Sequence, residues 1–449
     1  MRTRKKIMSL AVLAGLGAGS NQAFAAGFQL IEQNASGLGN AYAGQAAAAE
    51  DASTLFFNPA GMAYLPGKQG VVAGHIIIPS AKFSNTASTA AAGGFALGPN
   101  GGDAGDAAFV PNLYFTWTLD PKWSVGVGVN APFGLKTDYD SNWVGRFHAL
   151  KSEVKSYNVN PSIAFKANDN VSIGFGLNWQ RVEAELTKAV NYTAVGAGAG
   201  IGVAPATEGS NKITGNDNVW GFNLGAIFKA GPNTNIGLAY RSSMKYTLSG
   251  SAAFFGRPAA LQAALGAPAL AAQIGDSPIT ADIKLPASFS FAVKHQINSK
   301  WDVLADATRT QWSSIQALNI VRNTGFVLES VPFNWRNTWR VGLGFNYRPN
   351  QPWTVRFGVA YDQTPTSDTF RIPRIPDQDR TWLAIGAQYK VSQAGAIDFG
   401  YAHLFVKNPT LNMNGPPSLT PALLAGRGAL IGNYSSKVDI LSVQYRHNF

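Results

Sequence analysis

The sequence predicts an all-β fold, a 14-stranded antiparallel transmembrane β-barrel with an N-terminal plug inside its lumen. Three observations lead to this fold class. The chain begins with an export signal, apolar and polar residues alternate from about Gly70 onward, and short turns alternate strictly with long loops. We therefore expect a signal peptide over 1–25, a plug over 26–68 and a barrel over 69–449.

The export signal occupies the first residues. Basic residues between positions 2 and 6 precede an apolar run over 7–16, and Ala23-Phe24-Ala25 matches the small-residue pattern of a cleavage site. The mature chain should begin near Ala26. The apolar run is too short to span a bilayer, and no later stretch reaches the roughly 18 apolar residues of a transmembrane helix, which excludes a helical membrane protein.

The composition excludes several classes of function. The chain contains no cysteine, so it has neither a disulfide framework nor a thiolate metal site. The formal net charge is +11, but Lys and Arg are scattered, so we expect no nucleic-acid partner. The five histidines form no H-E-x-x-H motif and no serine lies in a G-x-S-x-G turn, so we expect no metal, no cofactor and no enzymatic activity.

The alternation predicts two-faced strands. From Trp353 to Asp362 every odd position is apolar or aromatic and every even position is small or polar. A soluble sandwich shows the same period, so the connections must decide between the two folds. Six tight turns of Pro, Asn, Asp, Gly or Ser alternate with seven long loops, which is typical of an outer-membrane barrel and joins fourteen strands. The turns are at 119–122, 168–170, 231–233, 298–300, 349–351 and 392–394, and the loops at 84–107, 131–149, 187–212, 250–276, 321–333, 364–376 and 407–433.

The strand ends agree with a multi-pass protein of the outer membrane of a Gram-negative bacterium. Trp117 and Trp123 flank one predicted turn, as expected of a periplasmic aromatic girdle. The last strand ends on the aromatic Phe449, as signals for the barrel-assembly machinery do. We expect a monomer whose partners are that machinery, outer-membrane lipid and lipopolysaccharide, and a hydrophobic small molecule.

The segment from Gly27 to Pro66 breaks the alternation and is rich in Gly, Ala and Asn. It is too polar and irregular to face lipid. A barrel of this size encloses a lumen wide enough for water unless something fills it. We therefore interpret this segment as the plug. Asn58 followed by Pro59 suits the start of a short helix, with Asn58 as its N-cap.

Five motifs stand out along the mature chain. They are Gly27-Phe28-Gln29-Leu30, the stretch SGLGNAYAG at 36–44, Phe57-Asn58-Pro59-Ala60-Gly61, NAPFGL at 130–135 and IPDQDR at 375–380. Together they resemble the FadL family of outer-membrane long-chain fatty acid transporters. The resemblance implies a barrel with an N-terminal hatch, in which ligand binds between two outer loops, descends to an internal pocket and leaves through an opening in the wall. It also marks the hatch residues Gly27, Phe28, Asn58, Pro59 and Ala60.

The loop from Ser251 to Gly275 is unusually apolar for a surface loop. An exposed apolar patch of this kind usually binds something, so we predict a landing groove for a hydrophobic ligand. The alternative is packing of one loop against another. The residues assigned to the groove are Phe254, Phe255, Leu261, Leu265, Leu270 and Ile274.

Three arginines are candidates for holding a ligand carboxylate. Unbroken alternation over 334–348 points Arg336 and Arg340 inward, and an inward arginine binds a carboxylate by charge-assisted hydrogen bonds. A bulge near Gln180 would turn Arg181 and Glu183 inward as well. The resemblance places basic ligand contacts near Arg336 and Arg181. The alternative is a salt bridge in the lumen with one of the inward acids Asp302, Asp306 and Asp362.

Pro132 lies in what is otherwise the third strand. A proline cannot donate to a sheet ladder, so the strand should break or kink there. The resemblance makes this kink a lateral gate, and the alternative is that Pro132 begins the outer loop. The gate candidates are Asn130, Ala131, Pro132, Phe133 and Gly134.

These observations favour passive outer-membrane transport of hydrophobic molecules, with long-chain fatty acids as the expected substrates. The stretch WVGRF at 143–147 also occurs in relatives that import aromatic hydrocarbons, so uptake of such hydrocarbons by the same route is an alternative. A general porin is a further alternative, and it would let small sugars through. An enzyme or adhesin would need a catalytic constellation or a large polar module, and the sequence shows neither.

Overall fold

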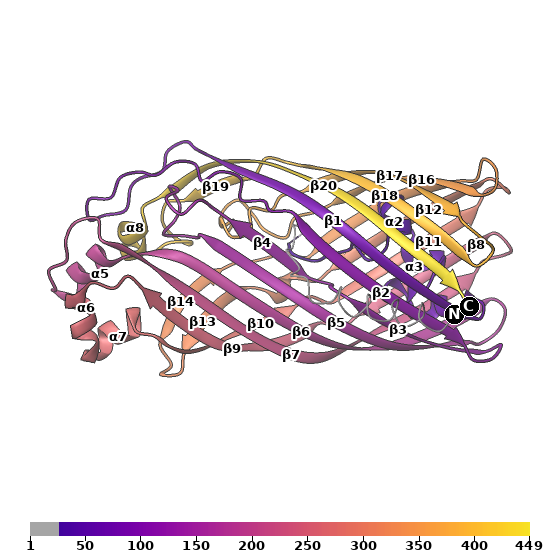
Figure 1. Cartoon of the computed structure of the whole chain (residues 1–449), viewed down its shortest axis with the longest axis horizontal. Helices are drawn as coiled ribbons and strands as arrows, with labels where there is room; N and C mark the ends of the chain where they lie inside the picture. Colours follow the sequence, from indigo (N-terminus) through magenta and orange to yellow (C-terminus); the bar gives the residue numbers. More distant parts are fainter. Residues whose placement is uncertain (1–26) are drawn as a thin grey trace, which may run out of the picture.

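A closed antiparallel β-barrel forms the wall of the molecule (Figure 1). The computed structural model describes residues 27–449, so the predicted signal peptide lies outside the described residues. Twenty β-strands form one sheet, which β1 and β20 close by pairing from Gln69 opposite Asn448 to Asn85 opposite Gly432. Six crossings of the wall each consist of two consecutive strands, which leaves the fourteen predicted strands.

The divided crossings are β3 with β4, β8 with β9, β10 with β11, β12 with β13, β14 with β15, and β18 with β19. The strand bounds are β1 (Lys68–Asn85), β2 (Ala108–Thr118), β3 (Trp123–Asn130), β4 (Gly134–Asp138), β5 (Lys151–Lys166), β6 (Val171–Asn191), β7 (Glu208–Lys229), β8 (Thr234–Arg241), β9 (Met244–Phe255), β10 (Ser277–Leu285), β11 (Ser288–Gln296), β12 (Trp301–Thr310), β13 (Ala317–Arg322), β14 (Val327–Pro332), β15 (Thr338–Tyr347), β16 (Trp353–Asp362), β17 (Arg380–Lys390), β18 (Gly395–Val406), β19 (Thr410–Met413) and β20 (Leu430–Asn448).

All six predicted turns join strands at one end of the barrel, which we call the turn end. The opposite end, the loop end, carries the long loops and their helices, on the left of Figure 1. One loop is shorter than expected, because β13 and β14 continue to Val321 opposite Val327 and leave only a tight connection with Gly325 at φ +84°. The loop helices are α5 (Tyr192–Ala199), α6 (Ala259–Ala263), η2 (Ala264–Gly266), α7 (Pro268–Ile274) and α8 (Pro421–Arg427), and the short helix η3 (Trp312–Ser314) lies within the divided crossing of β12 and β13.

The two faces of the wall follow the predicted alternation. In β16, Trp353 and Val359 are exposed on the outer surface, whereas Arg356 and Asp362 are buried in the lumen. Exposed Trp117 and Trp123 lie beside a turn, where a girdle at the membrane surface is expected. Within residues 27–449, no helix combines the length and apolarity needed to cross a membrane.

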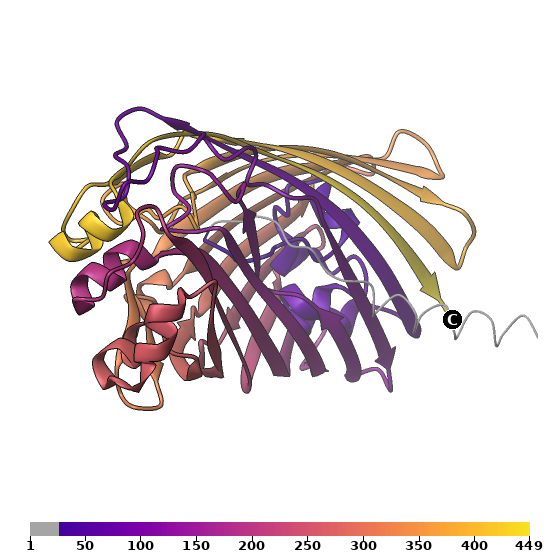
Figure 2. The ribbon, with the colours of Figure 1, turned by 60° about the vertical axis from the view of Figure 1, so that its left-hand side comes forward.

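The N-terminal segment, residues 27–67, lies inside the barrel near the turn end (Figure 2). Its short helices are α2 (Ala35–Leu38), α3 (Gln45–Ala48), α4 (Thr54–Phe57) and η1 (Pro59–Tyr64), and most of their side chains are buried. They pack directly on the wall, because glycines there leave room for their backbone. A Cβ at Gly358 would lie 2.1 Å from the carbonyl of Asn40, and one at Gly237 would lie 2.0 Å from the carbonyl oxygen of Ala46.

Candidate functional site

A groove opens between the long loops at the loop end. It has a volume of about 810 Å³ and is formed by α5, the end of β9, α7, β14 and α8. Phe254 and Ile274, both predicted for the landing groove, line it. Further apolar lining comes from Val190, Val195, Phe326, Val327, Leu328, Pro332 and Leu423.

The other four residues predicted for the landing groove lie elsewhere. Leu261 and Leu270 are buried in the hydrophobic core at the loop end, and Leu265 is half-buried against it. Phe255 points away and is 53% exposed. Phe254 and Ile274 belong to the same buried core, so packing within and between loops, the predicted alternative, describes five of the six residues. An apolar loop side chain has the same signature in the sequence whether it binds a ligand or a neighbouring loop.

Two cations flank one buried carboxylate in this groove. Lys188 Nζ lies 2.8 Å from Oε2 of Glu329, and Arg427 Nη1 lies 3.5 Å from its Oε1. Arg374 joins Glu329 and Arg427 in lining a small adjoining cavity. Three positive groups around a single carboxylate leave the cluster with a net positive charge, which suits an anionic ligand.

The guanidinium of Arg374 is fixed by oxygen atoms of the wall. Its Nη1 donates to Ser152 Oγ at 2.8 Å and to the carbonyls of Lys151 and Thr187 at 3.2 Å. His148 lines the same small cavity, but burial lowers its pKa to about 3, so the ring is neutral at physiological pH. No group of three or more His, Asp or Glu side chains within residues 27–449 is placed to hold a metal ion.

Glu329 and Arg374 also line an internal cavity of about 80 Å³ between the wall and the N-terminal segment. Besides these two residues, Ser152 is its only polar lining side chain among the residues described. The apolar lining consists of Phe28, Leu135, Val154, Val182, Ala184, Leu186, Leu248, Ile283, Leu285, Ile315, Leu318, Ile320, Val331, Phe333, Ile372 and Ile375. We call it the inner cavity.

Phe28 belongs to an aromatic cluster beside the inner cavity. Its ring centroid lies 5.2 Å from that of Trp312, 5.8 Å from that of Trp335 and 5.9 Å from that of Phe133. Aromatic contacts at these distances stabilise a packed arrangement. The predicted hatch residue Phe28 therefore joins the N-terminal segment to the wall.

β6 crosses the wall without the bulge predicted near Gln180, since its pairing with β7 is continuous over the whole strand. Odd positions therefore face outward throughout. Arg181 Nε lies 2.8 Å from Oε1 of Glu183 on the outer surface, so the predicted inward orientation of both residues is wrong. The apolar character moves to even positions because these line the inner cavity, namely Val182, Ala184 and Leu186.

The predicted inward orientation of Arg336 is also wrong. The connection between β14 and β15 is irregular, with Asn334 at φ +46°, and this resets the alternation. Trp335 points into the aromatic cluster and is 3% exposed, whereas Arg336 is exposed and donates from Nε to the carbonyl of Thr364 at 3.4 Å.

Arg340 points inward, as predicted, but it contacts the N-terminal segment. It donates to the carbonyl of Ala41, and its Nη1 lies 3.6 Å from Oδ2 of Asp306. The guanidinium also lies 5.4 Å from the ring centroid of Trp382. The predicted alternative of a salt bridge in the lumen therefore describes Arg340.

The third crossing of the wall breaks at Pro132, as predicted. β3 pairs with β2 as far as Val129 opposite Leu113, whereas β4 pairs with β5. In the described structure, residues 108–112 of β2 have no strand partner on the side of β4. Because the crossing resumes as β4, Pro132 does not simply begin an outer loop. We call the gap between 108–112 and 131–133 the wall break.

The N-terminal segment covers the wall break from inside. The amide of Leu30 donates to the carbonyl of Pro132, and the amide of Gly134 donates to the carbonyl of Phe28, both at 2.8 Å. Toward the loop end, the amide of Asp138 donates to the carbonyl of Ala104 at 3.1 Å, which joins the two sides again. All five predicted gate residues are buried in this closed arrangement, namely Asn130, Ala131, Pro132, Phe133 and Gly134.

Asn58 holds the N-terminal segment to the wall. Its Oδ1 accepts from the amide of Ala60 at 3.1 Å, as predicted for the N-cap of a helix that begins with Pro59. Its Nδ2 donates to carbonyls of β7 and β8 at 3.0 and 3.2 Å. Near the start of the segment, the amide of Gly27 donates to Asp377 Oδ2 at 2.9 Å.

The charged cluster of Lys188, Glu329, Arg374 and Arg427 was not predicted from the sequence. Lys188 continues the even positions of β6, so it would have been found had the strand been read without a bulge. Arg374 lies in the predicted loop at 364–376. No sequence pattern around Glu329 or Arg427 identifies either as a site residue, because segments that are distant in the sequence meet only in the folded protein.

Comparisons with known proteins agree with this architecture. The model of the family described as outer membrane protein transport protein (OMPP1/FadL/TodX) matches residues 16–449. The chain is 32% identical over 421 residues to the 47 kDa outer membrane protein of Pasteurella multocida, covering 92% of this chain and 94% of the relative. It is 27% identical over 418 residues to the long-chain fatty acid transport protein of Escherichia coli, covering 88% and 91%.

Solved structures show the same fold. A crystal structure of a Pseudomonas aeruginosa FadL homologue is 29% identical with a TM-score of 0.86, covering 94% of this chain and 100% of that chain. The P. putida toluene transporter TodX is 17% identical with a TM-score of 0.65, covering 89% and 94%. The family match, the closed barrel and the membrane-facing apolar surface agree, and the chain belongs to the OMPP1/FadL/TodX family of outer membrane transport proteins.

Proposed function

We propose that this protein carries hydrophobic molecules passively across the outer membrane, with long-chain fatty acids as its preferred substrates. The observation that carries the proposal is the position of Glu329, which lines the outer groove, the small adjoining cavity and the inner cavity. Because one side chain borders all three cavities, we infer that they are parts of one route. The route is apolar with a charged cluster at its junction, which matches an amphiphile with a carboxylate and an acyl chain.

Lys188 and Arg427 form the proposed head-group site. Both contact Glu329, and both lie at the junction where a ligand would pass from the outer groove to the inner cavity. A carboxylate arriving there would take the place of Glu329 as a partner for one cation. Hydrogen bonds between ionised groups are about twice as strong as neutral ones, so they would select an acid over a hydrocarbon.

The inner cavity is the proposed site for the acyl chain. At about 80 Å³ it is far smaller than the roughly 300–1,000 Å³ of pockets that hold drug-sized ligands. A long acyl chain therefore requires the cavity to widen. Phe28 is the lining residue that the N-terminal segment supplies, so movement of this segment would enlarge the cavity.

The same movement would open the proposed lateral gate. The backbone of Phe28 and Leu30 is hydrogen-bonded to one edge of the wall break, at Pro132 and Gly134. Withdrawal of this backbone would expose the gap between β2 and β4 while enlarging the inner cavity. The rest of the N-terminal segment, packed on the wall, would act as the hatch that blocks the central axis.

Uptake of aromatic hydrocarbons by the same route is the alternative. The family description includes TodX, which supports this alternative. An arene has no charge for Lys188 and Arg427 to bind, so the cluster favours an acid. A general porin is disfavoured, because the N-terminal segment occupies the lumen.

Calorimetry on the purified protein in detergent tests the head-group site. We expect Lys188→Met to weaken oleate binding about tenfold, equivalent to about 1.4 kcal/mol, and to leave oleyl alcohol binding unchanged. Arg336→Ala, which removes an exposed arginine, is the matched control and should change neither affinity. The double variant Lys188→Met/Glu329→Gln avoids leaving Glu329 without its lysine and should show the same selectivity. Equal losses for both ligands would contradict the proposal.

A further inference from the structure

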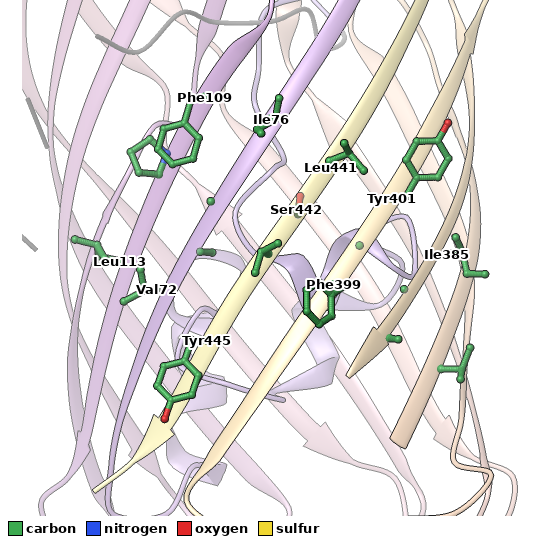
Figure 3. A pocket seen from close by; sticks show the side chains of 18 residues that line it. Val72, Ile76, Phe109, Leu113, Ile385, Phe399, Tyr401, Leu441, Ser442 and Tyr445 are labelled. Carbon is green, nitrogen blue, oxygen red and sulfur yellow. The ribbon is translucent and has the colours of Figure 1, made fainter. Parts of the chain in front are cut away.

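An apolar groove lies on the membrane-facing side of the wall, outside the lumen (Figure 3). It has a volume of about 1150 Å³ and crosses six neighbouring strands, β2, β1, β20, β18, β17 and β16. In Figure 3, Phe109, Tyr401 and Tyr445 stand around it and Phe399 lies near its centre. We call it the outer-wall groove.

The outer-wall groove reaches the wall break. Phe109 and Pro111, which line the groove, belong to the stretch of β2 that borders the break. Gly74 on β1 lies beneath the ring of Phe109, since a Cβ at Gly74 would be 2.9 Å from Phe109 Cε2. The absence of a side chain at Gly74 therefore leaves room for the ring of Phe109 over β1.

The opposite side of the break is charged near the loop end. Lys136 on β4 pairs with Asp106 across the top of the break. Lys151 Nζ lies 3.1 Å from both Glu153 Oε2 and Glu185 Oε1 on the outer surfaces of β5 and β6. A hydrocarbon chain gains nothing from contact with such groups, whereas Phe109 on the β2 side offers an apolar surface that is 44% exposed.

We propose that the outer-wall groove is a second binding site, which receives the acyl chain of the transported molecule as it passes out through the wall break. This inference rests on the proposed function. The occupant is the exported acyl chain, because the groove begins at the strand edge where that chain would emerge. Bilayer lipid would fill the groove whether or not the wall break is open. Occupancy that depends on an open wall break therefore identifies the transported acyl chain as the occupant.

Photolabelling distinguishes these sources. A diazirine-tagged fatty acid is added outside intact cells, and labelled residues are identified by mass spectrometry. We expect labels at Val72 and Leu441, which line the groove, and at Val182 in the inner cavity. Ala131→Trp, which fills the wall break, should reduce the groove labels at least tenfold and retain the label at Val182. The same probe mixed beforehand into the membrane should label the groove equally in both proteins.

Groove labels that persist unchanged in Ala131→Trp would overturn the proposal, because bilayer lipid would then explain them. A second variant covers the case in which Ala131→Trp does not fold. Val443→Trp fills the groove from an outward position that is 52% exposed, and we expect fatty acid uptake to fall several-fold while the label at Val182 in the inner cavity is retained. The control is Ile173→Trp, at an outward position on β6 that is 50% exposed.

Equal uptake by the Val443→Trp and Ile173→Trp proteins would also overturn the outer-wall groove as a site. Failure of the proposed function gives a different result, since the wild-type protein would then support no fatty acid uptake and no label would reach Val182. If uptake and labelling of the inner cavity are normal but the groove labels do not depend on the wall break, only the inference about the outer-wall groove is rejected.

Discussion

The two halves of β6 have opposite polarity. Toward the turn end, Asn178 and Gln180 are buried in the lumen and Leu177 is exposed outside. Toward the loop end, Val182 lines the inner cavity and Arg181 faces outward. A charge facing lipid at the middle of a bilayer costs about 2–4 kcal/mol, so the reversal marks where the wall leaves the membrane. The barrel is thus a polar, filled tube within the membrane and an apolar container above it.

The largest expected effect comes from breaking the polar half. Arg356 lies 2.6 Å from Asp398 and 3.2 Å from Glu50 of the N-terminal segment, and all three groups are largely buried. Removing one partner of a buried ion pair costs about 3–5 kcal/mol. We expect Arg356→Ala to lower the thermal unfolding temperature sharply, measured by heat-dependent migration on gels. Arg356→Lys should recover part of the loss, and an unchanged transition in Arg356→Ala would show that the polar half is not held by this cluster.

The next largest expected effect is a pH dependence of the free energy of unfolding, which arises in the same polar half of the barrel. Glu32 is 1% exposed, and within residues 27–449 neither of its carboxylate oxygens has a hydrogen-bond partner. Burial raises the pKa of Glu32 from 4.5 to about 7. The folded protein therefore keeps a proton that the unfolded chain releases, so the free energy of unfolding falls as the pH rises from about 4.5 to 7.

This difference is on the order of 3 kcal/mol or less. Urea unfolding at pH 5 and pH 8 measures it, and Glu32→Gln should remove most of the difference. A Glu32→Gln protein with the full pH dependence of the wild type would assign that dependence to other groups.

A polar side chain placed in the apolar half of β6 should weaken oleate binding more than it lowers the stability of the fold. Ala184→Asn places an amide in the inner cavity, where a bound acyl chain would leave it without a hydrogen-bond partner. Burial of such a group costs about 1–3 kcal/mol, so we expect oleate affinity to fall roughly tenfold by calorimetry, with a nearly unchanged unfolding temperature. Ala184→Val, which keeps the cavity apolar, is the control, and equal affinities for the two variants would contradict the role of this cavity.

The polarity reversal also explains how far the sequence could predict the structure. Strand number, turns and the break of the strand at Pro132 follow from local patterns, and the fold confirms them. The N-terminal plug was predicted from a local pattern too. The predicted inward orientation of Arg181 is wrong because the switch of apolar residues from odd to even positions in β6 suggests a bulge, whereas it reflects the change from membrane to inner cavity along the strand. The predicted inward orientation of Arg336 is wrong because the irregular connection before β15 resets the alternation. The cluster at Glu329 depends on contacts between distant loops, which no local pattern records.

The smallest expected effect is on the outer surface of the apolar half. Arg181 and Glu183 form an ion pair whose side chains are 35% and 42% exposed, and exposed pairs contribute about 1 kcal/mol or less. Arg181→Ala should therefore shift the unfolding temperature only slightly and leave oleate affinity unchanged, whereas Lys188→Met on the same strand should weaken oleate binding. These two residues differ in the parity of their positions, so the comparison isolates which face of β6 meets the ligand. A loss of oleate affinity in Arg181→Ala equal to that in Lys188→Met would mean that the strand presents both faces to the route, which a continuous register does not allow.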